Sequence, residues 1–324
     1  MPLCPHPPVF SGNPLDRADH LRTDPALMGR WRERQDARFA LFAADRILSD
    51  SHGAVYWLKP SDIPSFSDSE CLFLGLDEGA PHYAIRFSDQ ADNQSGILDG
   101  ATHEGRAAEG CKFRDLRACA MKLGHAHSDL AIMAQAKSML DWHTHHRFCA
   151  ACGKESSLKK AGYERFCNHC NSSHFPRTDP VVIMLAVYKG KALVGQNKQM
   201  PAGFYSALAG YMEPGETIEE ATARELMEEA GVRTTRARYI TSQPWPWPSS
   251  LMIAMIADVD NDQVTLDDTE LAAVRWISKK DAAAALKGML PDLMLPPPLA
   301  VAHTLIKAWI EESASITDDS GAGF

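Results

Sequence analysis

The sequence contains no apolar run of about 18 residues, the length that a membrane-spanning helix requires. Its first residues lack a basic stretch followed by an apolar one, so we expect no secretory signal peptide and a cytoplasmic location. No repeat of fixed period is found along the 324 residues. These absences argue against a membrane partner, a secreted protein and a repeat protein.

An excess of basic residues is absent as well, because the formal net charge is −9. The chain therefore has no overall attraction for nucleic acid, although a local basic groove is compatible with this charge. Apolar residues make up 45% and charged residues 23%, which is the balance of a globular protein. A chain of this length usually divides into more than one domain.

Cysteine is sparse, but four of the eight cysteines form two close pairs, Cys149 with Cys152 and Cys167 with Cys170. Each Cys-x-x-Cys turn can direct two sulfurs to one ion, and four thiolates complete the tetrahedral shell of zinc. The spacing predicts a structural zinc ribbon with no open position for chemistry. A redox dithiol or four free thiols are the alternatives, and the second pair argues against the first of these.

Hydrophobic patterning predicts an α/β protein in which a sheet is flanked by helices. The expected strands are 54–58, 71–74, 181–188, 191–195, 206–211, 251–259 and 274–278. The expected helices are 128–146, 218–230 and 300–312. The first 125 residues form an α/β or α+β unit with a small core of its own, and their chemistry is not legible from the sequence.

The best-defined helix begins after Thr217, which forms a capping box with Glu220, and ends at Gly231. At about 100° per residue, Glu225, Glu228 and Glu229 fall within one arc of this helix. We expect the opposite arc to dock on the sheet; its residues are Ala223, Leu226, Met227 and Ala230. A row of carboxylates is usually a solvated face, but a partly enclosed one requires divalent cations such as magnesium or manganese.

The segment from Gly210 to Val232 matches every fixed position of the Nudix signature, so the chain resembles the Nudix hydrolases. The resemblance implies an α/β/α sandwich with a mixed sheet and cleavage of a pyrophosphate bond with bound magnesium or manganese. It implies an ion pair between Arg224 and Glu216 that braces the motif. It also implies a set of metal ligands: Glu225, Glu228, Glu229, the carbonyl of Ala209 and the later Glu270.

A proline-rich aromatic segment follows the Nudix box after ten residues. It consists of Gln243, Pro244, Trp245, Pro246, Trp247, Pro248, Ser249 and Ser250. Alternating prolines favour a stiff, extended segment that presents the two tryptophans to a ring system. A rigid connector with tryptophans in the core is the alternative. The segment resembles the mark of the NADH pyrophosphatase subfamily, with Trp247 where that mark has phenylalanine.

The resemblance to this subfamily includes the cysteine ribbon and the segment from His174 to Arg177. It implies substrate contacts by Phe175, by the backbone at Ala302 and by the proline-rich segment, and more weakly a phosphate contact by Arg117. One departure is Gly162, which stands where some relatives carry a substrate-facing glutamate.

We therefore expect a metal-dependent diphosphatase that splits NADH or NAD into nicotinamide mononucleotide and AMP, and that can also act on NAD-capped RNA. The resemblance implies a homodimer. The expected parts are an N-terminal domain (1–127), a connector helix (128–146), a zinc ribbon (147–176), a Nudix catalytic domain (177–312) and a flexible tail (313–324). Two alternatives remain open: hydrolysis of ADP-ribose or another dinucleoside compound, and nucleic-acid binding by the ribbon beside an inactive Nudix domain.

Overall fold

The computed structural model describes residues 7–63, 71–87, 110–124, 127–266 and 269–312. The chain divides into two compact units that exchange short segments. The first unit combines Met1–Val9, Asp179–Pro244 and Ser250–Phe324, and the second combines Phe10–Thr178 with Trp245–Ser249. The predicted tail, 313–324, lies outside the described residues.

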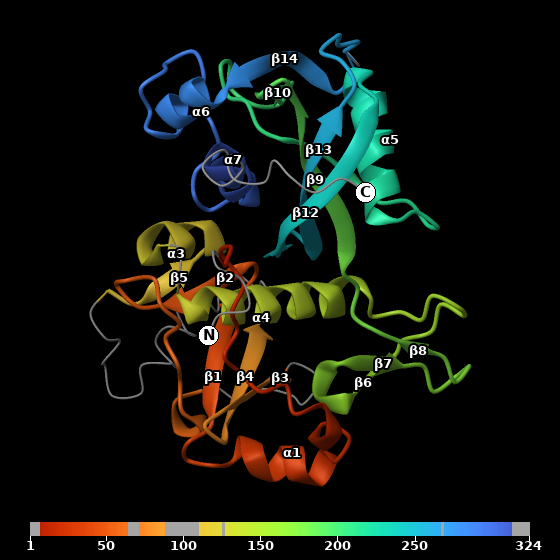
Figure 1. Ribbon diagram of the computed structural model, residues 1–324. Coiled ribbons are helices and arrows are strands. Elements are labelled where there is room, and N and C mark those ends of the chain that lie inside the picture. The colour runs from red at the N-terminus through yellow and green to blue at the C-terminus, as the bar shows by residue number, and fades with distance from the viewer. Residues whose placement is uncertain (1–6, 64–70, 88–109, 125–126, 267–268, 313–324) are drawn as a thin grey trace, which may run out of the picture. The chain divides into compact units, whose positions relative to one another are not determined.

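The first unit is built around a six-stranded mixed sheet (Figure 1). Its strands are β9 (Asp179–Tyr188), β10 (Lys191–Asn197), β11 (Leu208–Tyr211), β12 (Thr234–Trp245), β13 (Ser250–Val259) and β14 (Leu271–Ser278). The order is β12-β13-β9-β10-β14, and β11 also pairs with β9. β13 runs parallel to β9, whereas β10 and β11 run antiparallel to it. The helices are α5 (Ile218–Ala230), α6 (Lys279–Leu286) and α7 (Val301–Glu311).

The central strand β9 separates two apolar cores because successive side chains of a strand point to opposite faces. Val182 and Met184 belong to the core that includes Leu226 of α5. Ile183 and Leu185 belong to the other core, which contains the apolar face of α7. Figure 1 shows α5 on one side of the sheet and α6 and α7 on the other. This α/β/α sandwich confirms the predicted fold class.

The second unit contains a five-stranded sheet in the order β3-β4-β1-β2-β5 and a three-stranded ribbon in the order β6-β7-β8. The strands of the larger sheet are β1 (Arg38–Ala43), β2 (Arg46–Ser49), β3 (Cys71–Asp77), β4 (Ala80–Phe87) and β5 (Lys112–Arg114). The ribbon consists of β6 (Ser157–Lys159), β7 (Glu164–Phe166) and β8 (Ser173–His174). The helices are α1 (Pro25–Arg32), α3 (Leu116–Leu123), α4 (Ser128–His145) and the short 3-10 helices η1 (Asp19–Leu21), η2 (Pro60–Asp62) and η4 (Lys160–Gly162).

The predicted strand at 54–58 is wrong, because this segment forms only two isolated bridges. Val55 bridges to Ser49 at the end of β2, and Leu58 bridges to Phe39 in β1. The segment thus passes from one strand to another and follows neither. Val55 and Leu58 are both buried in the core. Their apolar side chains gave the segment a pattern like that of a strand, although it pairs with no strand along its length.

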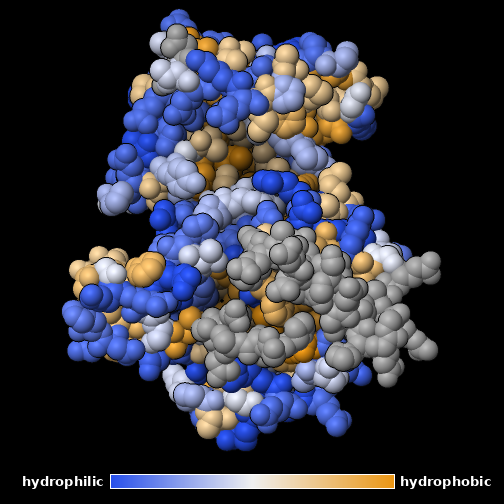
Figure 2. Space-filling view, turned by 180° about the vertical axis from the view of Figure 1, so that it is seen from behind, coloured by the Kyte–Doolittle hydropathy of each residue, from blue (hydrophilic) through white to orange (hydrophobic). Residues whose placement is uncertain are grey.

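No helix among the described residues is long and apolar enough to cross a membrane. The longest one, α4, has 18 residues and carries buried Lys137 and Asp141, which form an ion pair. On the face drawn in Figure 2, hydrophilic side chains predominate and hydrophobic ones gather in small groups.

Candidate active site and metal centre

Helix α5 is capped at both ends by residues that the sequence predicted. The Thr217 hydroxyl accepts a hydrogen bond from the Glu220 amide at 3.2 Å, and the Glu220 carboxylate accepts one from the Thr217 amide at 2.8 Å. This is the predicted capping box. At the other end Gly231 is left-handed, with φ 67° and ψ 18°, as expected for a glycine stop.

The buried face of α5 differs from the predicted one. Leu226 and Ala230 are buried as expected, but Met227 is 47% exposed. Glu225 and Glu229 are buried instead, at 9% and 6% exposure. The helix is therefore turned so that two glutamates lie against the protein, and the expectation for Met227 is wrong. Packing of the helix on β11, through a glycine described below, permits this orientation.

Arg224 holds the loop and the helix together. Its Nε lies 2.6 Å from one oxygen of Glu216, and its Nη2 lies 2.9 Å from the other. Nη1 donates to Glu225 at 2.8 Å and to Glu228 at 2.9 Å. Paired guanidinium and carboxylate groups of this geometry form strong, directional hydrogen bonds. Arg224 lowers the pKa of Glu216 to about 2, with a smaller contribution from the Glu213 amide.

Gly210 lies directly against the Glu225 carboxylate. A Cβ at this position would be 1.9 Å from the carboxyl carbon of Glu225, a distance that no side chain permits. The absence of a side chain at Gly210 thus leaves a cradle that the Glu225 carboxylate fills. Burial raises the pKa of Glu225, Arg224 opposes this effect, and the negative charges of Glu228 and Glu270 add to the increase. Glu270 therefore lies close enough to Glu225 for their charges to interact.

The donors in this region are all oxygen atoms, which suits magnesium or manganese better than softer metals. Ala209 lies next to Gly210 in β11 and pairs with Ile183 of β9. Among the described residues, the carboxylate oxygens of these glutamates do not form a group of potential metal ligands as close together as the four ribbon cysteines do. The Arg224 guanidinium lies between Glu225 and Glu228. The residue types, the cradle and the burial fit a divalent cation.

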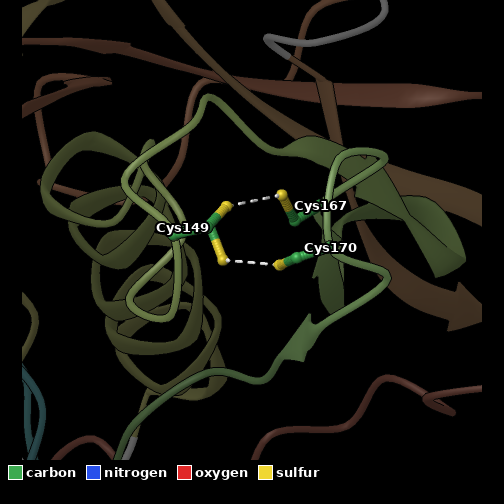
Figure 3. A group of neighbouring side chains, drawn as sticks. Cys149, Cys167 and Cys170 are labelled. Carbon is green, nitrogen blue, oxygen red and sulfur yellow. Dashed lines mark hydrogen bonds between the residues drawn. The ribbon is translucent and has the colours of Figure 1, made fainter.

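The four predicted zinc ligands converge on one point in the ribbon. The sulfurs of Cys149, Cys152, Cys167 and Cys170 all lie within 4.8 Å of one another. The Cys149–Cys170 and Cys152–Cys167 sulfur distances are 3.5 Å, so neither pair is a disulfide. In Figure 3 the sulfurs of Cys149, Cys167 and Cys170 point toward one another. Four thiols at these positions form a metal site of the ribbon type.

His174 also lies beside this centre. The only sign of this in the sequence is that His174 follows Cys170 by four residues. Its Nε2 lies 3.2 Å from the sulfur of Cys149. Hydrogen bonds of this kind orient a metal ligand and tune its basicity. His169, the other nearby histidine, does not belong to the group of four ligands among the described residues.

The two tryptophans of the proline-rich segment form an aromatic cluster in the second unit. Their ring centroids lie 4.8 Å apart, and Phe10 meets both rings edge-on, at 6.2 Å from Trp245 and 5.6 Å from Trp247. The Arg117 guanidinium lies 4.1 Å above the Trp247 ring. The structure thus brings Arg117 and Trp247 together. Phe10 lies far from the tryptophans along the chain, and no sequence signal connects it with them.

Gln243 is 1% exposed. The hydrogen bonds found for its side-chain amide join it to backbone groups. It donates to the carbonyls of Val9 at 3.0 Å and Leu299 at 2.9 Å, and it accepts from the Val301 amide at 2.8 Å. Ala302, the next residue, is buried in the first turn of α7. Its proposed role and that of Gln243 as substrate contacts stay predictions.

The remaining predicted contacts lie in the second unit, with the exception of Pro244 and Ser250. Ser249 donates to the carbonyl of Arg177 at 2.9 Å. Phe175 is 60% exposed, and the Lys160 ammonium lies 5.6 Å from its ring centroid. Gly162 has φ 102°, and a Cβ there would lie 2.4 Å from Leu72. A glutamate in this backbone conformation would be strained.

Three family models match successive parts of the chain. The NADH pyrophosphatase-like rudimentary NUDIX domain matches residues 36–142, the NADH pyrophosphatase zinc ribbon domain matches 145–175, and the NUDIX domain matches 177–293. A crystal structure of a NUDIX hydrolase from Nitrosomonas europaea aligns with 52% of this chain and 92% of that chain, with 22% identity and a TM-score of 0.39.

Curated relatives agree with these models. The NAD-capped RNA hydrolase NUDT12 of Homo sapiens is 39% identical over 193 residues, which are 56% of this chain and 42% of that protein. This chain therefore spans less than half the length of NUDT12. The mitochondrial NAD(P)H pyrophosphatase NUDT13 of Homo sapiens is 36% identical over 288 residues, covering 85% of this chain and 78% of that protein. The chain belongs to the NADH pyrophosphatase family of NUDIX hydrolases, as its sequence motifs predicted.

Proposed function

We propose that this protein hydrolyses the pyrophosphate bond of NADH or NAD and releases nicotinamide mononucleotide and AMP. The observation that carries this proposal is the Arg224-braced glutamate helix, whose Glu225 is enclosed against Gly210. The same chain contains the aromatic cluster of Trp245 and Trp247. In such a dinucleotide, the pyrophosphate suits a metal ion held by the glutamates, and a planar ring suits the tryptophans.

The α5 glutamates, Glu270 and the carbonyl of Ala209 are the proposed ligands of a magnesium or manganese ion. When bound, such an ion neutralises the phosphate oxygens, lowers the pKa of a coordinated water and stabilises the leaving phosphate. Arg224 and Glu216 hold the helix and its preceding loop in register. A carboxylate in this cluster accepts the proton of the attacking water, as general base catalysis requires.

The proposed substrate contacts are Phe175, Arg117, the backbone at Ala302 and the proline-rich segment from Gln243 to Ser250 with its two tryptophans. Stacking on a tryptophan face suits nicotinamide and adenine rings. Arg117, which lies over Trp247, has a guanidinium suited to a phosphate oxygen. Zinc in the cysteine centre is proposed to stabilise the ribbon without taking part in the reaction.

A second candidate substrate is NAD-capped RNA. Relatives named NAD-capped RNA hydrolase support it, namely NUDT12 of Homo sapiens and NudC of Escherichia coli, the latter 36% identical over 169 residues. The same bond is cleaved in both substrates, so one site serves both. The chain-wide charge of −9 favours the free dinucleotide.

A panel of substrates tests the proposal. Purified full-length protein is assayed with magnesium or manganese on NADH, NAD, ADP-ribose, a diadenosine polyphosphate and NAD-capped RNA. We expect the highest kcat/KM on a nicotinamide dinucleotide or its RNA-linked form. A higher value on ADP-ribose or the diadenosine compound would replace the proposal with the broader Nudix alternative. Inactivity on all five would favour an inactive Nudix domain beside a nucleic-acid-binding ribbon.

The homodimer, the cytoplasmic location and the five-part division of the chain also stay predictions. Light scattering coupled to size-exclusion chromatography measures the oligomeric state. Cell fractionation checks the location, and limited proteolysis checks the boundaries near residues 127, 146, 176 and 312.

A further inference from the structure

The cysteine centre of the ribbon is built from two turns, 149–153 and 167–171, with matching backbone geometry. The Gly153 amide donates to the Cys149 carbonyl at 2.9 Å, and the Asn171 amide donates to the Cys167 carbonyl at 2.9 Å. Gly153 and Asn171 both have left-handed backbones, with φ 73° and 60°. Glycine and asparagine are the residues that adopt this conformation most readily. The two turns therefore hold their cysteines in corresponding positions.

Each turn contains one buried and one partly exposed cysteine. The first cysteine of each turn is buried, with Cys149 3% exposed and Cys167 0% exposed. The second cysteine, Cys152 or Cys170, is partly exposed. The residues that flank these two cysteines are exposed, namely 150, 151, 153, 168, 169 and 171. Solvent therefore reaches the second cysteine of each turn more readily than the first.

Two sulfur contacts cross from one turn to the other (Figure 3). The sulfurs of Cys149 and Cys170 lie 3.5 Å apart, and so do those of Cys152 and Cys167. Each contact thus joins a buried sulfur to a partly exposed one. A disulfide has a sulfur–sulfur distance of about 2 Å, so a movement of roughly 1.5 Å would bring either pair to bonding distance.

Exposure and pairing together determine how this centre meets an oxidant. The thiolate is the form of cysteine that binds zinc, and it is also the form that reacts with peroxides. Because reactivity follows exposure, Cys152 and Cys170 are the expected points of attack. A sulfenic acid formed at either one has a second sulfur 3.5 Å away with which it can condense to a disulfide. The centre thus contains an attacked and a resolving cysteine twice over.

We propose that the cysteine centre is a reversible modification site for hydroperoxides, in which Cys149 bonds to Cys170, Cys152 bonds to Cys167 and zinc is released. This inference rests on the zinc ligation proposed above and does not depend on the proposed hydrolysis. It differs from a redox dithiol within one Cys-x-x-Cys turn, because each new bond joins the two turns.

The reaction at one pair takes two steps. The Cys170 thiolate attacks one peroxide oxygen, the O–O bond breaks and hydroxide leaves, so that Cys170 becomes a sulfenic acid. The Cys149 thiolate then attacks the Cys170 sulfur, the S–O bond breaks and a second hydroxide leaves. Two protons from solvent convert the hydroxides to water. Two thiolates are thereby oxidised to one disulfide, while one hydrogen peroxide is reduced to two water molecules.

Cys152 and Cys167 react in the same way with a second peroxide. Loss of the four thiolates removes the ligands that hold zinc, so the ion leaves with its oxidation state unchanged. The two disulfides then link the turns covalently where the metal had linked them. The oxidised ribbon should therefore stay folded without metal, in contrast to a ribbon whose zinc is removed by a chelator.

Hydrogen peroxide treatment of the zinc-loaded full chain tests the proposal. A chromophoric chelator measures released zinc, and dimedone traps sulfenic acids. Samples are quenched in acid, and peptide mass spectrometry identifies the dimedone adducts and the disulfides. We expect release of one zinc ion per chain, adducts on Cys152 or Cys170, and the disulfides Cys149–Cys170 and Cys152–Cys167. Dithiothreitol with added zinc should restore the four thiols and the bound metal.

Cys111→Ser is the matched control, because Cys111 is partly exposed but lies outside the cluster. This variant should release zinc at the same peroxide concentration as the unaltered chain. Loss of zinc release in Cys111→Ser would locate the reactive thiol elsewhere and overturn the proposal.

Further results would also overturn the proposal: zinc retention in millimolar peroxide, disulfides within one turn (Cys149–Cys152 or Cys167–Cys170), or oxidation that dithiothreitol does not reverse. A chain that binds no zinc would remove its premise. Failure of NADH hydrolysis together with normal zinc release and the two expected disulfides would count against the proposed function only.

Discussion

The carboxyl carbon of Glu225 lies 1.9 Å from the position that a Cβ on Gly210 would occupy. Strand β11 and helix α5 therefore meet at a point where only a hydrogen atom separates the backbone from the carboxylate. The position of this carboxylate depends on the absence of a side chain at Gly210 and on the ion pair of Glu225 with Arg224.

Gly210→Ala should lower kcat/KM for NADH by about 100-fold, because the Glu225 carboxylate must move by roughly 1 Å or more to make room. Steady-state kinetics measure this effect. Gly29→Ala is the control, since Gly29 lies in α1 and has nothing within 4 Å of the position that the added methyl group would occupy. Equal losses in both variants would show that the close approach to Glu225 is not responsible.

Glu225→Gln and Glu229→Gln should each reduce hydrolysis by about two orders of magnitude, or about 2.7 kcal/mol of transition-state stabilisation. They should also reduce the increase in Tm that added manganese produces, because a ligand that binds only the folded state stabilises it. Differential scanning fluorimetry measures the second effect. Glu219→Gln changes an exposed glutamate of the same helix and should leave both quantities unaltered. Full activity of the Glu229 variant would remove this helix from catalysis.

The ion pair of Glu216 with Arg224 should give stability a defined pH dependence. The pKa of Glu216 is lowered from 4.5 to about 2 in the folded chain, so its contribution is present above pH 4.5 and is lost as the pH falls toward 2. The Tm difference between the unaltered chain and Glu216→Gln should therefore shrink across this window. A difference that stays constant as the pH falls from neutrality through this window would contradict the assigned cause.

Removal of the ribbon metal should unfold the ribbon and leave a smaller folded remainder. Elemental analysis should find one zinc ion per chain, and Cys167→Ser should release it, because four thiolates complete the shell. Cys111→Ser, outside the cluster, is the control and should retain zinc. His174→Ala should weaken zinc binding about 10-fold to 100-fold without abolishing it, as expected for a hydrogen-bond partner of a ligand. Retention of zinc by the Cys167 variant would exclude the proposed ligand set.

Gln243→Ala should destabilise the first unit by about 2–4 kcal/mol, because it leaves the buried Val9 carbonyl and Val301 amide, and the partly buried Leu299 carbonyl, without their hydrogen-bond partner. Chemical denaturation measures the loss. Gln199→Ala changes an exposed glutamine and should cost less than about 0.5 kcal/mol. If Gln243→Ala raised KM without loss of stability, its amide would act on the substrate and not on the fold.

Local sequence signals predicted helix α5 and the cysteine centre well. The bounds of α5 follow from Thr217 and Gly231, and the cysteine spacing predicted the four-sulfur cluster. Both features depend on residues close together in the chain, so geometry along a single helix or turn is enough to derive them.

Features that depend on long-range packing were not predictable. The exposure of Met227 depends on how α5 approaches β11, which helical periodicity does not determine. Phe10 meets Trp245 and Trp247 through a contact between distant parts of the chain. The pocket of about 610 Å³ that Arg22, Phe73 and Lys159 line combines segments from three separate stretches of sequence.

Strand β9 is hydrogen-bonded on both edges over most of its length. β13 pairs with residues 179–187 on one edge, and β11 and β10 pair with residues 181–184 and 187–188 on the other. The amides of β9 should therefore exchange with deuterated solvent only when the whole first unit opens, whereas those of β12 and β14, at the ends of the sheet, should exchange through local fraying. Protection from exchange should be greatest in β9, the strand with which Ala209 and Gly210 of β11 pair. The backbone beside Glu225 therefore belongs to the part of the first unit that opens most slowly.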